Sequence, residues 1–328
     1  MAGSQERVLR RRIRSIQSTK KITRAMELIA ASQLVRSQGR VRAAAPYQEA
    51  IAEVLADVAA DSPTGPGRLM GVPENPQRVL VLAAVADRGL CGGYNSAVLR
   101  TTERLIRAGR QGGTEYRVVT VGRKAQAYFR FRGQEMAQSF SGFSEKPSFE
   151  DARAVADAVV APFLAEEVDQ VMVVSTRFVS SGTQVVQVRQ VLPLPEGGAG
   201  HDGGVASKTP PSGAEGGVAR VAADASDVAG SSGTDKAGYT EFEPDSSEML
   251  AALVPSYAAA AVFGALLEAA SSELTARQRA MAAATENAED LIKTLARVMN
   301  RARQEAITTE IMEIVGGAEA LQGAEAGH

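Results

Sequence analysis

The chain has 328 residues, of which 45% are hydrophobic and only 5% aromatic, and its formal net charge is −2. This length allows two domains with a sizeable core, and the aromatic-poor composition favours long helices packed through Ala, Val and Leu. One cysteine excludes an intrachain disulfide, and two histidines, His201 in a glycine-rich tract and the terminal His328, argue against a His-based zinc site or a Ser-His-Asp triad.

Charge is distributed unevenly along the chain. Residues 1–45 carry eleven Lys or Arg and two Glu, whereas residues 196–245 carry nine acidic and three basic side chains. A strongly basic helix suits nucleic acid, an anionic membrane surface or an acidic protein partner. Composition leaves these three partners open.

A long helix is predicted at the N-terminus. No proline occurs between Ser4 and Ala45, and apolar residues recur there at spacings of three and four. We therefore expect a helix over 1–60 that is kinked at Pro46. Its apolar stripe consists of Leu9, Ile13, Ile16, Ile22, Met26 and Ile29.

A second long helix is expected over 256–316, because no proline lies between Ser256 and Val315 and two glycines follow at 316 and 317. Seven of its apolar residues are separated by alternating gaps of three and four, which is the pattern of a coiled-coil seam. A helical domain could bury the same stripes, but their length and their location at opposite chain ends favour an antiparallel pair. The seam residues are Met281, Ala284, Ala288, Leu291, Leu295, Val298 and Ala302.

The segment 78–194 alternates strand-like and helix-like stretches, which predicts a mostly parallel sheet that could end in an antiparallel edge hairpin. Ser148 and Asp151 resemble a capping box at the start of one helix. The predicted fold class is therefore α/β: a Rossmann-like domain plus a long antiparallel coiled coil of the N- and C-terminal helices.

The remaining segments are assigned as connections. Residues 61–77 are expected to be a linker, 239–255 a return segment to the second helix, and 317–328 a flexible tail. Residues 195–238 contain eleven glycines and no Phe, Tyr or Trp, so we expect this acidic insertion to be disordered.

The loop DRGLCGGYN (87–95) follows a strand-like run, as phosphate-binding loops do. Its glycines at 89, 92 and 93 do not fit G-x-G-x-x-G, the loop holds no lysine, and the next strand-like run ends in Gly122, Arg123 and Lys124 rather than in an acidic ribose ligand. The loop is therefore predicted to be a structural turn or a partner-binding loop, and no cofactor is expected.

No apolar run reaches the roughly 18 to 20 residues that a transmembrane helix needs. The longest, 257–267, is followed directly by Glu268. We expect no membrane-spanning segment.

Three motifs, in this order along the chain, resemble the γ subunit of F-type ATP synthases, in a bacterial form with a long insertion. They are RIRSIQSTKKITRAMELIAAS (12–32), with a K-I-T-x-A-M core from Lys21 to Met26, the loop DRGLCGGYN (87–95), and ITTEIMEIVGGA (307–318). The sequence departs from the family pattern at Ala86, Gln278 and Glu305, where Ser, Met and Ala are usual.

The resemblance implies a rotor without an active site, cofactor or metal of its own. In that family the terminal helices form a shaft inside a ring of three α and three β subunits, and the α/β domain stands on the c-ring. Proton flow turns the c-ring and the shaft, which forces each catalytic β subunit through different nucleotide affinities. One copy would assemble with the α, β and ε subunits and the c-ring, peripherally at the cytoplasmic face of a bacterial cell membrane.

By the same resemblance, two groups of residues are expected to contact partners. Lys21, Met26, Arg303 and Gln304 would contact the α/β ring, although Met26 could equally be a plain seam residue. Tyr239, Phe242 and Glu243 would contact the c-ring and the ε subunit.

The sequence is also compatible with two functions other than a rotor. One is a nucleotide-dependent enzyme that uses the middle domain. The other is a basic coiled-coil protein that binds nucleic acid or acts as a scaffold, for which steeply salt-dependent DNA binding would be the signature.

Overall fold

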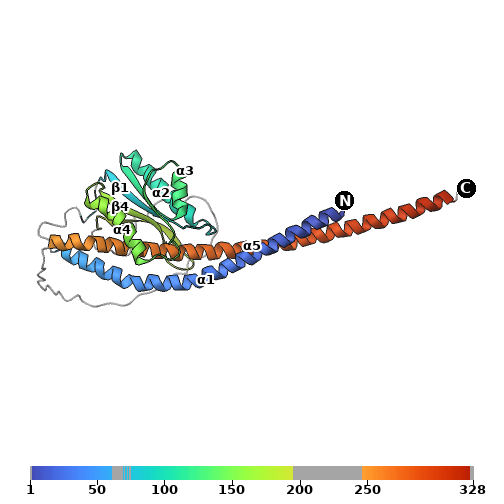
Figure 1. The fold of residues 1–328 in the computed structure, drawn as a ribbon, viewed down its shortest axis with the longest axis horizontal. Coiled ribbons are helices and arrows are strands. Elements are labelled where there is room, and N and C mark those ends of the chain that lie inside the picture. Colours follow the sequence, from blue (N-terminus) through green and yellow to red (C-terminus); the bar gives the residue numbers. More distant parts are fainter. Residues whose placement is uncertain are drawn as a thin grey trace, which may run out of the picture.

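The computed structural model describes residues 2–60, 69, 71, 73, 75–194 and 246–325. Two long helices, α1 (Ala2–Ala60) and α5 (Ser246–Glu325), lie side by side, and an α/β domain packs on one side of them (Figure 1). The chain runs in opposite directions in the two helices, and the N- and C-termini lie toward the same end of the molecule. The predicted combination of an antiparallel helical pair with a Rossmann-like domain is confirmed.

The α/β domain is built on one five-stranded sheet with the order β3-β2-β1-β4-β5. The first four strands are parallel, and β5 pairs antiparallel with β4 at the edge, as the sequence suggested. The strands are β1 (Arg78–Ala84), β2 (Glu115–Val121), β3 (Met136–Phe140), β4 (Gln170–Phe178) and β5 (Gln184–Leu192).

Helices cover both faces of the sheet, because successive side chains of a strand point to opposite faces. Val79, Val81 and Ala83 of β1 pack with α2 (Tyr94–Gln111) and α3 (Arg123–Phe131). Leu80 and Leu82 of the same strand pack with α4 (Phe149–Leu164), α5 and the end of α1. Burying a Val or Leu side chain contributes about 1.5–3 kcal/mol. Because residues of α5 bury one face of the sheet, α5 belongs to the core of the domain.

The start of α4 confirms the predicted capping box. The Ser148 hydroxyl accepts a hydrogen bond from the Asp151 amide at 3.1 Å, and the Asp151 carboxylate accepts one from the Ser148 amide at 2.8 Å. Two amides that the first helical turn cannot satisfy are thereby paired.

One strand was not predicted. β3 is the sequence MAQSF at the edge of the sheet, and its middle residues are exposed. An edge strand with solvent on its side chains needs no apolar run, since its backbone hydrogen bonds to β2 hold it in place.

The bounds of α5 differ from the sequence expectation at both ends. The helix begins at Ser246 and contains Pro255, and it continues through Gly316 and Gly317 to Glu325. A glycine ends a helix by adopting a left-handed conformation, and Gly316 does not have a positive φ. A glycine inside a helix lowers the stability of the helix by only about 1 kcal/mol relative to alanine, so the helix can continue through Gly316. α1 likewise continues through Pro46.

Within the described ranges, one helical stretch, Ala252–Gly316, has the length and composition that could cross a membrane, and 67% of its most apolar window is buried inside the protein. The core helix of a folded domain has the same property. The predicted disorder of 195–238 falls outside the described residues.

Candidate functional site: the paired helices and their junction with the α/β domain

Two buried pairs of hydroxyls set the register of α1 against α5, which together are called the shaft below. Thr23 Oγ1 lies 2.8 Å from Thr285 Oγ1, and Ser37 Oγ lies 2.8 Å from Ser271 Oγ. Fourteen residues separate the two contacts on each helix, which equals two heptads. The helices therefore pair antiparallel without a slip of register over this length.

The stripe predicted on α1 is covered at four of its six residues. Leu9, Ile13, Ile16 and Met26 are half-buried as expected, whereas Ile22 and Ile29 are 58% and 56% exposed. The seam continues instead through the half-buried or buried residues Lys20, Thr23, Glu27, Ala30 and Leu34. The apolar pattern alone was misleading because α1 carries a second apolar stripe on its outer face.

On α5, the seam prediction is wrong at two of its seven positions. Met281, Ala284, Ala288, Leu295 and Ala302 are buried or half-buried as expected, but Leu291 and Val298 are 53% and 47% exposed. Ile292 and Met299 take the places of these two residues in the seam. Leu291 and Ile292 are both apolar, as are Val298 and Met299, so only the pairing with α1 decides which residue of each pair is covered.

The C-terminal end of α5 projects beyond α1 (Figure 1). Five large apolar side chains in this projecting part are about half exposed or more, which is unfavourable in water for so many neighbours on one helix. They are Ile307, Ile311, Met312, Ile314 and Val315. We call this group the apolar tip.

The structure places the predicted ring contacts at two separate heights of the shaft. Lys21 is exposed and Met26 half-buried on α1, close to where Lys20 Nζ pairs with Glu289 Oε1 at 2.6 Å. Arg303 and Gln304 are exposed on α5, fourteen residues beyond Glu289, which is about 21 Å of helix. The other predicted contacts, Tyr239, Phe242 and Glu243, lie outside the described residues.

The loop after β1 joins three strand ends through one carboxylate. Asp87 Oδ1 accepts a hydrogen bond from the Arg123 amide at 3.0 Å, and its Oδ2 accepts from the amides of Gly142 at 2.8 Å and Ser144 at 3.2 Å. These amides follow β2 and β3, so the side chain ties the carboxyl edges of three parallel strands together.

This loop lies at the place where such sheets usually bind ligands, beside the reversal of strand order between β1 and β4. Here α5 covers it. The Tyr94 hydroxyl donates to the Ala269 carbonyl at 3.2 Å, and Arg277 Nη2 lies 3.4 Å from the Gly89 carbonyl. The loop thus serves as a docking turn for α5, and the crevice that a nucleotide would need is filled by the helix.

A buried charged cluster lies beneath the loop and was missed by sequence reasoning. Arg277 Nη2 is 2.7 Å from Glu273 Oε1, and its Nη1 is 3.1 Å from Glu145 Oε1. Burial raises the pKa of Glu273 to about 7, although the Arg277 guanidinium acts to lower it. Glu and Arg four residues apart within an apolar helical stretch were the available signal.

Cys91 is also part of this junction. Its side chain is buried with Ala86 and Tyr94, and burial raises the pKa of its thiol. Among the described residues, no group of His, Cys, Asp or Glu could hold a metal ion.

A family model described as ATP synthase matches residues 5–321. The chain is 46% identical to an ATP synthase gamma chain of Frankia casuarinae, over 98% of this chain and 99% of that one. It is 42% identical to an ATP synthase gamma chain of Mycolicibacterium gilvum, over 96% and 97% of the two chains.

The chain belongs to the ATP synthase gamma chain family. Solved structures agree with the gamma chain fold. A chain of the Euglena gracilis mitochondrial ATP synthase (OSCP/F1/c-ring, rotational state 3) has a TM-score of 0.64 at 14% identity and covers 98% of this chain and 96% of its own. A chain of the Tetrahymena thermophila central stalk and c-ring has a TM-score of 0.55 at 19% identity, covering 80% and 99%. The alternative of a nucleic-acid-binding or scaffold coiled coil finds no support in these relatives.

Proposed function

We propose that the chain is the central rotor of a proton-translocating F1Fo ATP synthase, and that it has no active site of its own. The observation that carries this proposal is the architecture of a gamma chain family member: a long antiparallel shaft whose longer helix is also part of the core of the α/β domain. Rotation applied to the domain is therefore transmitted to the shaft without an intervening flexible joint in α5.

The shaft acts as a ligand of the catalytic ring whose contacts change with its angle. In the proposed mechanism the c-ring turns the α/β domain, and the asymmetric shaft then presents different side chains to each β subunit. Because a ligand shifts a conformational equilibrium only by its differential affinity, these unequal contacts set the nucleotide affinity of each β subunit.

The shaft has two surfaces suited to such contacts. The exposed basic residues of α1, including Lys21, provide ion pairs that exchange readily in water. The apolar tip provides a surface that a partner with apolar walls would cover while allowing it to turn, since hydrophobic contact is not directional.

Four residues of the described shaft are assigned to the ring. Arg303 and Gln304, exposed near the base of the apolar tip, would hydrogen-bond a β-subunit loop. Lys21 and Met26 would contact a second β subunit lower on the shaft. Met26 is half-buried, so its side chain can serve both the seam and the ring.

The other end of the molecule is assigned to the membrane sector. Tyr239, Phe242 and Glu243 would contact the c-ring and the ε subunit, and the complex would lie at the cytoplasmic face of a bacterial cell membrane. These assignments rest on the family resemblance of the sequence.

Coexpression with the α, β and ε subunits tests the proposal. We expect one copy of the chain in a purified complex that hydrolyses ATP, and rotation of a bead attached at Glu135→Cys, an exposed position of the domain. A folded chain that never joins an α/β assembly, or a complex that turns over ATP without moving the bead, would refute the rotor.

A further inference from the structure

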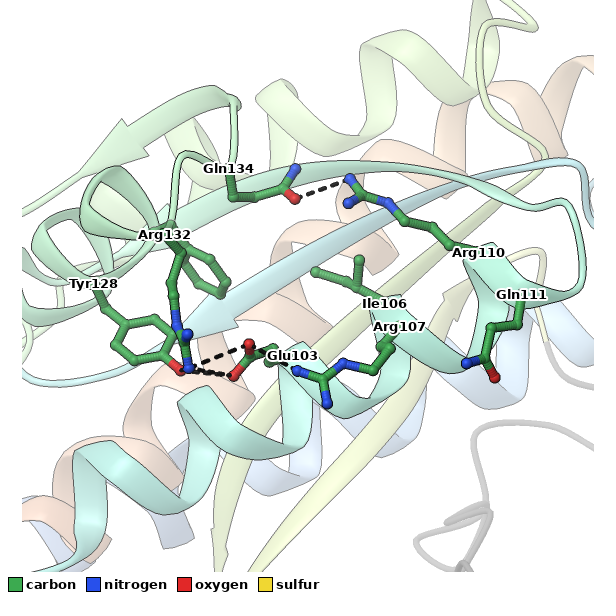
Figure 2. A pocket seen from close by; sticks show the side chains of 9 residues that line it. Glu103, Ile106, Arg107, Arg110, Gln111, Tyr128, Arg132 and Gln134 are labelled. Atoms are coloured by element: carbon green, nitrogen blue, oxygen red, sulfur yellow. Dashed lines mark hydrogen bonds and ion pairs between the residues drawn. The ribbon is translucent and has the colours of Figure 1, made fainter.

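A hollow of about 450 Å³ lies between α2 and α3, on the face of the sheet away from the shaft (Figure 2). Its walls come from one side of each helix and from the turn after α3. The polar lining residues are Glu103, Arg107, Arg110, Gln111, Tyr128, Arg132 and Gln134. The rotor function uses none of them.

Positive charge exceeds negative charge in this hollow. Glu103 Oε1 lies 3.2 Å from Arg107 Nη2 and 3.4 Å from Arg132 Nη2, so one carboxylate is shared by two guanidinium groups. A hydrogen bond from the Tyr128 hydroxyl at 2.7 Å lowers the pKa of Glu103, as do the two arginines, and keeps it ionised. Glu103 therefore positions Arg107 and Arg132 without neutralising both.

Arg110 brings a third guanidinium group with a neutral partner. Its Nη2 donates to Gln134 Oε1 at 2.9 Å, and among the described residues no carboxylate is paired with it. Figure 2 shows the Arg110 guanidinium group beside Gln134, apart from Glu103 and the side chains paired with it. An amide can orient a guanidinium group but leaves its full charge available to a ligand.

The base of the hollow is apolar. Ile106 and Phe129 line it and are 5% and 2% exposed. Low-polarity atoms behind a charged group reduce the local dielectric screening, so an anion held here interacts more strongly with the arginines than it would on a flat surface.

The groove between the two helices continues beyond this hollow. A second hollow of about 560 Å³ shares Glu103, Tyr128 and Arg132 and adds the basic residues Arg100 and Lys124. Five basic side chains and one acidic side chain thus line the whole groove.

The arginines of the groove can stabilise the C-termini of α2 and α3, but this role accounts for only part of their positive charge. α2 ends at Gln111 and α3 at Phe131, and a helix C-terminus carries roughly half a negative charge that basic side chains offset. Two such ends and Glu103 still leave about one positive charge from the three guanidinium groups of the first hollow.

We propose that this groove is a binding site for a phosphate-bearing anion with at least two negative charges. Arg107 and Arg132, held by Glu103, would contact one phosphate group and Arg110 another, because a guanidinium group matches two phosphate oxygens with parallel N–H donors. The shared chemistry is the phosphate, which either a free polyphosphate compound or a lipid headgroup can supply.

Calorimetric titration of the full-length chain with inorganic pyrophosphate at fixed ionic strength tests the site by measuring the affinity and the number of bound ligands. We expect saturable binding of one pyrophosphate per chain. Arg110→Gln should weaken it about tenfold, since one charge-assisted contact is lost. Arg104→Gln, an equal change of charge at an exposed residue of the same helix that does not line the groove, should change it less than twofold.

A parallel measurement uses vesicles of phosphatidylcholine with and without phosphatidylglycerol. Weaker binding of pyrophosphate by Arg110→Gln assigns a soluble ligand. Weaker binding by this variant to the anionic vesicles alone assigns a lipid headgroup, and either result supports the site. Saturable binding to neither probe overturns the proposal. So does equal weakening by Arg104→Gln, which would show that diffuse surface charge accounts for the binding.

Discussion

Replacing Arg277 with methionine tests how the α/β domain is fixed to the shaft. The Arg277 side chain is 6% exposed and contacts both Glu273 and Glu145. Methionine fills much of the same space but leaves the carboxylate of Glu273, only 1% exposed, without its cation. Removing one partner of a buried ion pair costs about 3–5 kcal/mol.

Protonation of Glu273 limits this loss. The pKa of Glu273 is about 7 with Arg277 present, because burial outweighs the effect of the guanidinium group. Without Arg277 the pKa rises further, and Glu273 becomes neutral at neutral pH. We therefore expect a loss near the lower end of the range, about 3 kcal/mol at pH 7.

The pH dependence follows from the same residue. Its folded pKa lies above the ordinary value of 4.5, so its contribution to stability is complete below pH 4.5 and is lost as the pH rises through 7. That interval corresponds to roughly 3 kcal/mol at 1.36 kcal/mol per pH unit. In Arg277→Met the decline should extend to higher pH.

Urea unfolding of the full-length chain at pH 5 and pH 8 measures both effects. Arg297→Met, an exposed site on the same helix, is the control and should change stability by less than about 0.5 kcal/mol. Adding Glu273→Gln to Arg277→Met should recover stability at pH 8, where the lone carboxylate is most costly. If Arg277→Met costs no more than the control at either pH, the cluster does not fix the domain to α5.

Three further experiments have definite expected outcomes. Arg303→Ala or Gln304→Ala should reduce ATP-driven rotation and coupling in a complex that still assembles; unchanged coupled activity would remove both from the ring contact. Gly122→Ala should cost at least about 2 kcal/mol in urea unfolding, since φ is 98° and a Cβ would collide with a backbone carbonyl of the loop after β1, whereas Gly133→Ala, with φ 66° and open space, should cost about 1 kcal/mol. Cys91 should react with iodoacetamide far more slowly in the native chain than in urea, because its thiol is buried and its pKa raised; equal rates would contradict its burial.

Local patterns predicted most of the fold. Strand β1 is an apolar run of Val, Leu and Ala, β4 is rich in β-branched residues, and α4 begins with a capping box, so a few neighbouring residues specify each element. The order of the three motifs along the chain likewise indicated the family. β3 was missed because its backbone pairing with β2, rather than its side chains, makes it a strand.

The candidate sites were less predictable. The seam was right except at Ile22, Ile29, Leu291 and Val298, because α1 and α5 each carry two adjacent apolar stripes and only contacts such as Thr23 with Thr285 select one. The groove arginines come from two helices with no sequence motif, and the structure alone brings Arg110 and Arg132 to one hollow.

The sequence by itself determined that the chain forms two long terminal helices around an α/β domain, and that the loop at 87–95 lacks the residues of a phosphate site. Only the tertiary structure decided that α5 fills the crevice beside this loop and buries Glu273 with Arg277 there. Helical and strand periodicity are local properties of a sequence. Burial, register and pKa depend on residues that are distant in the chain and meet only when it folds.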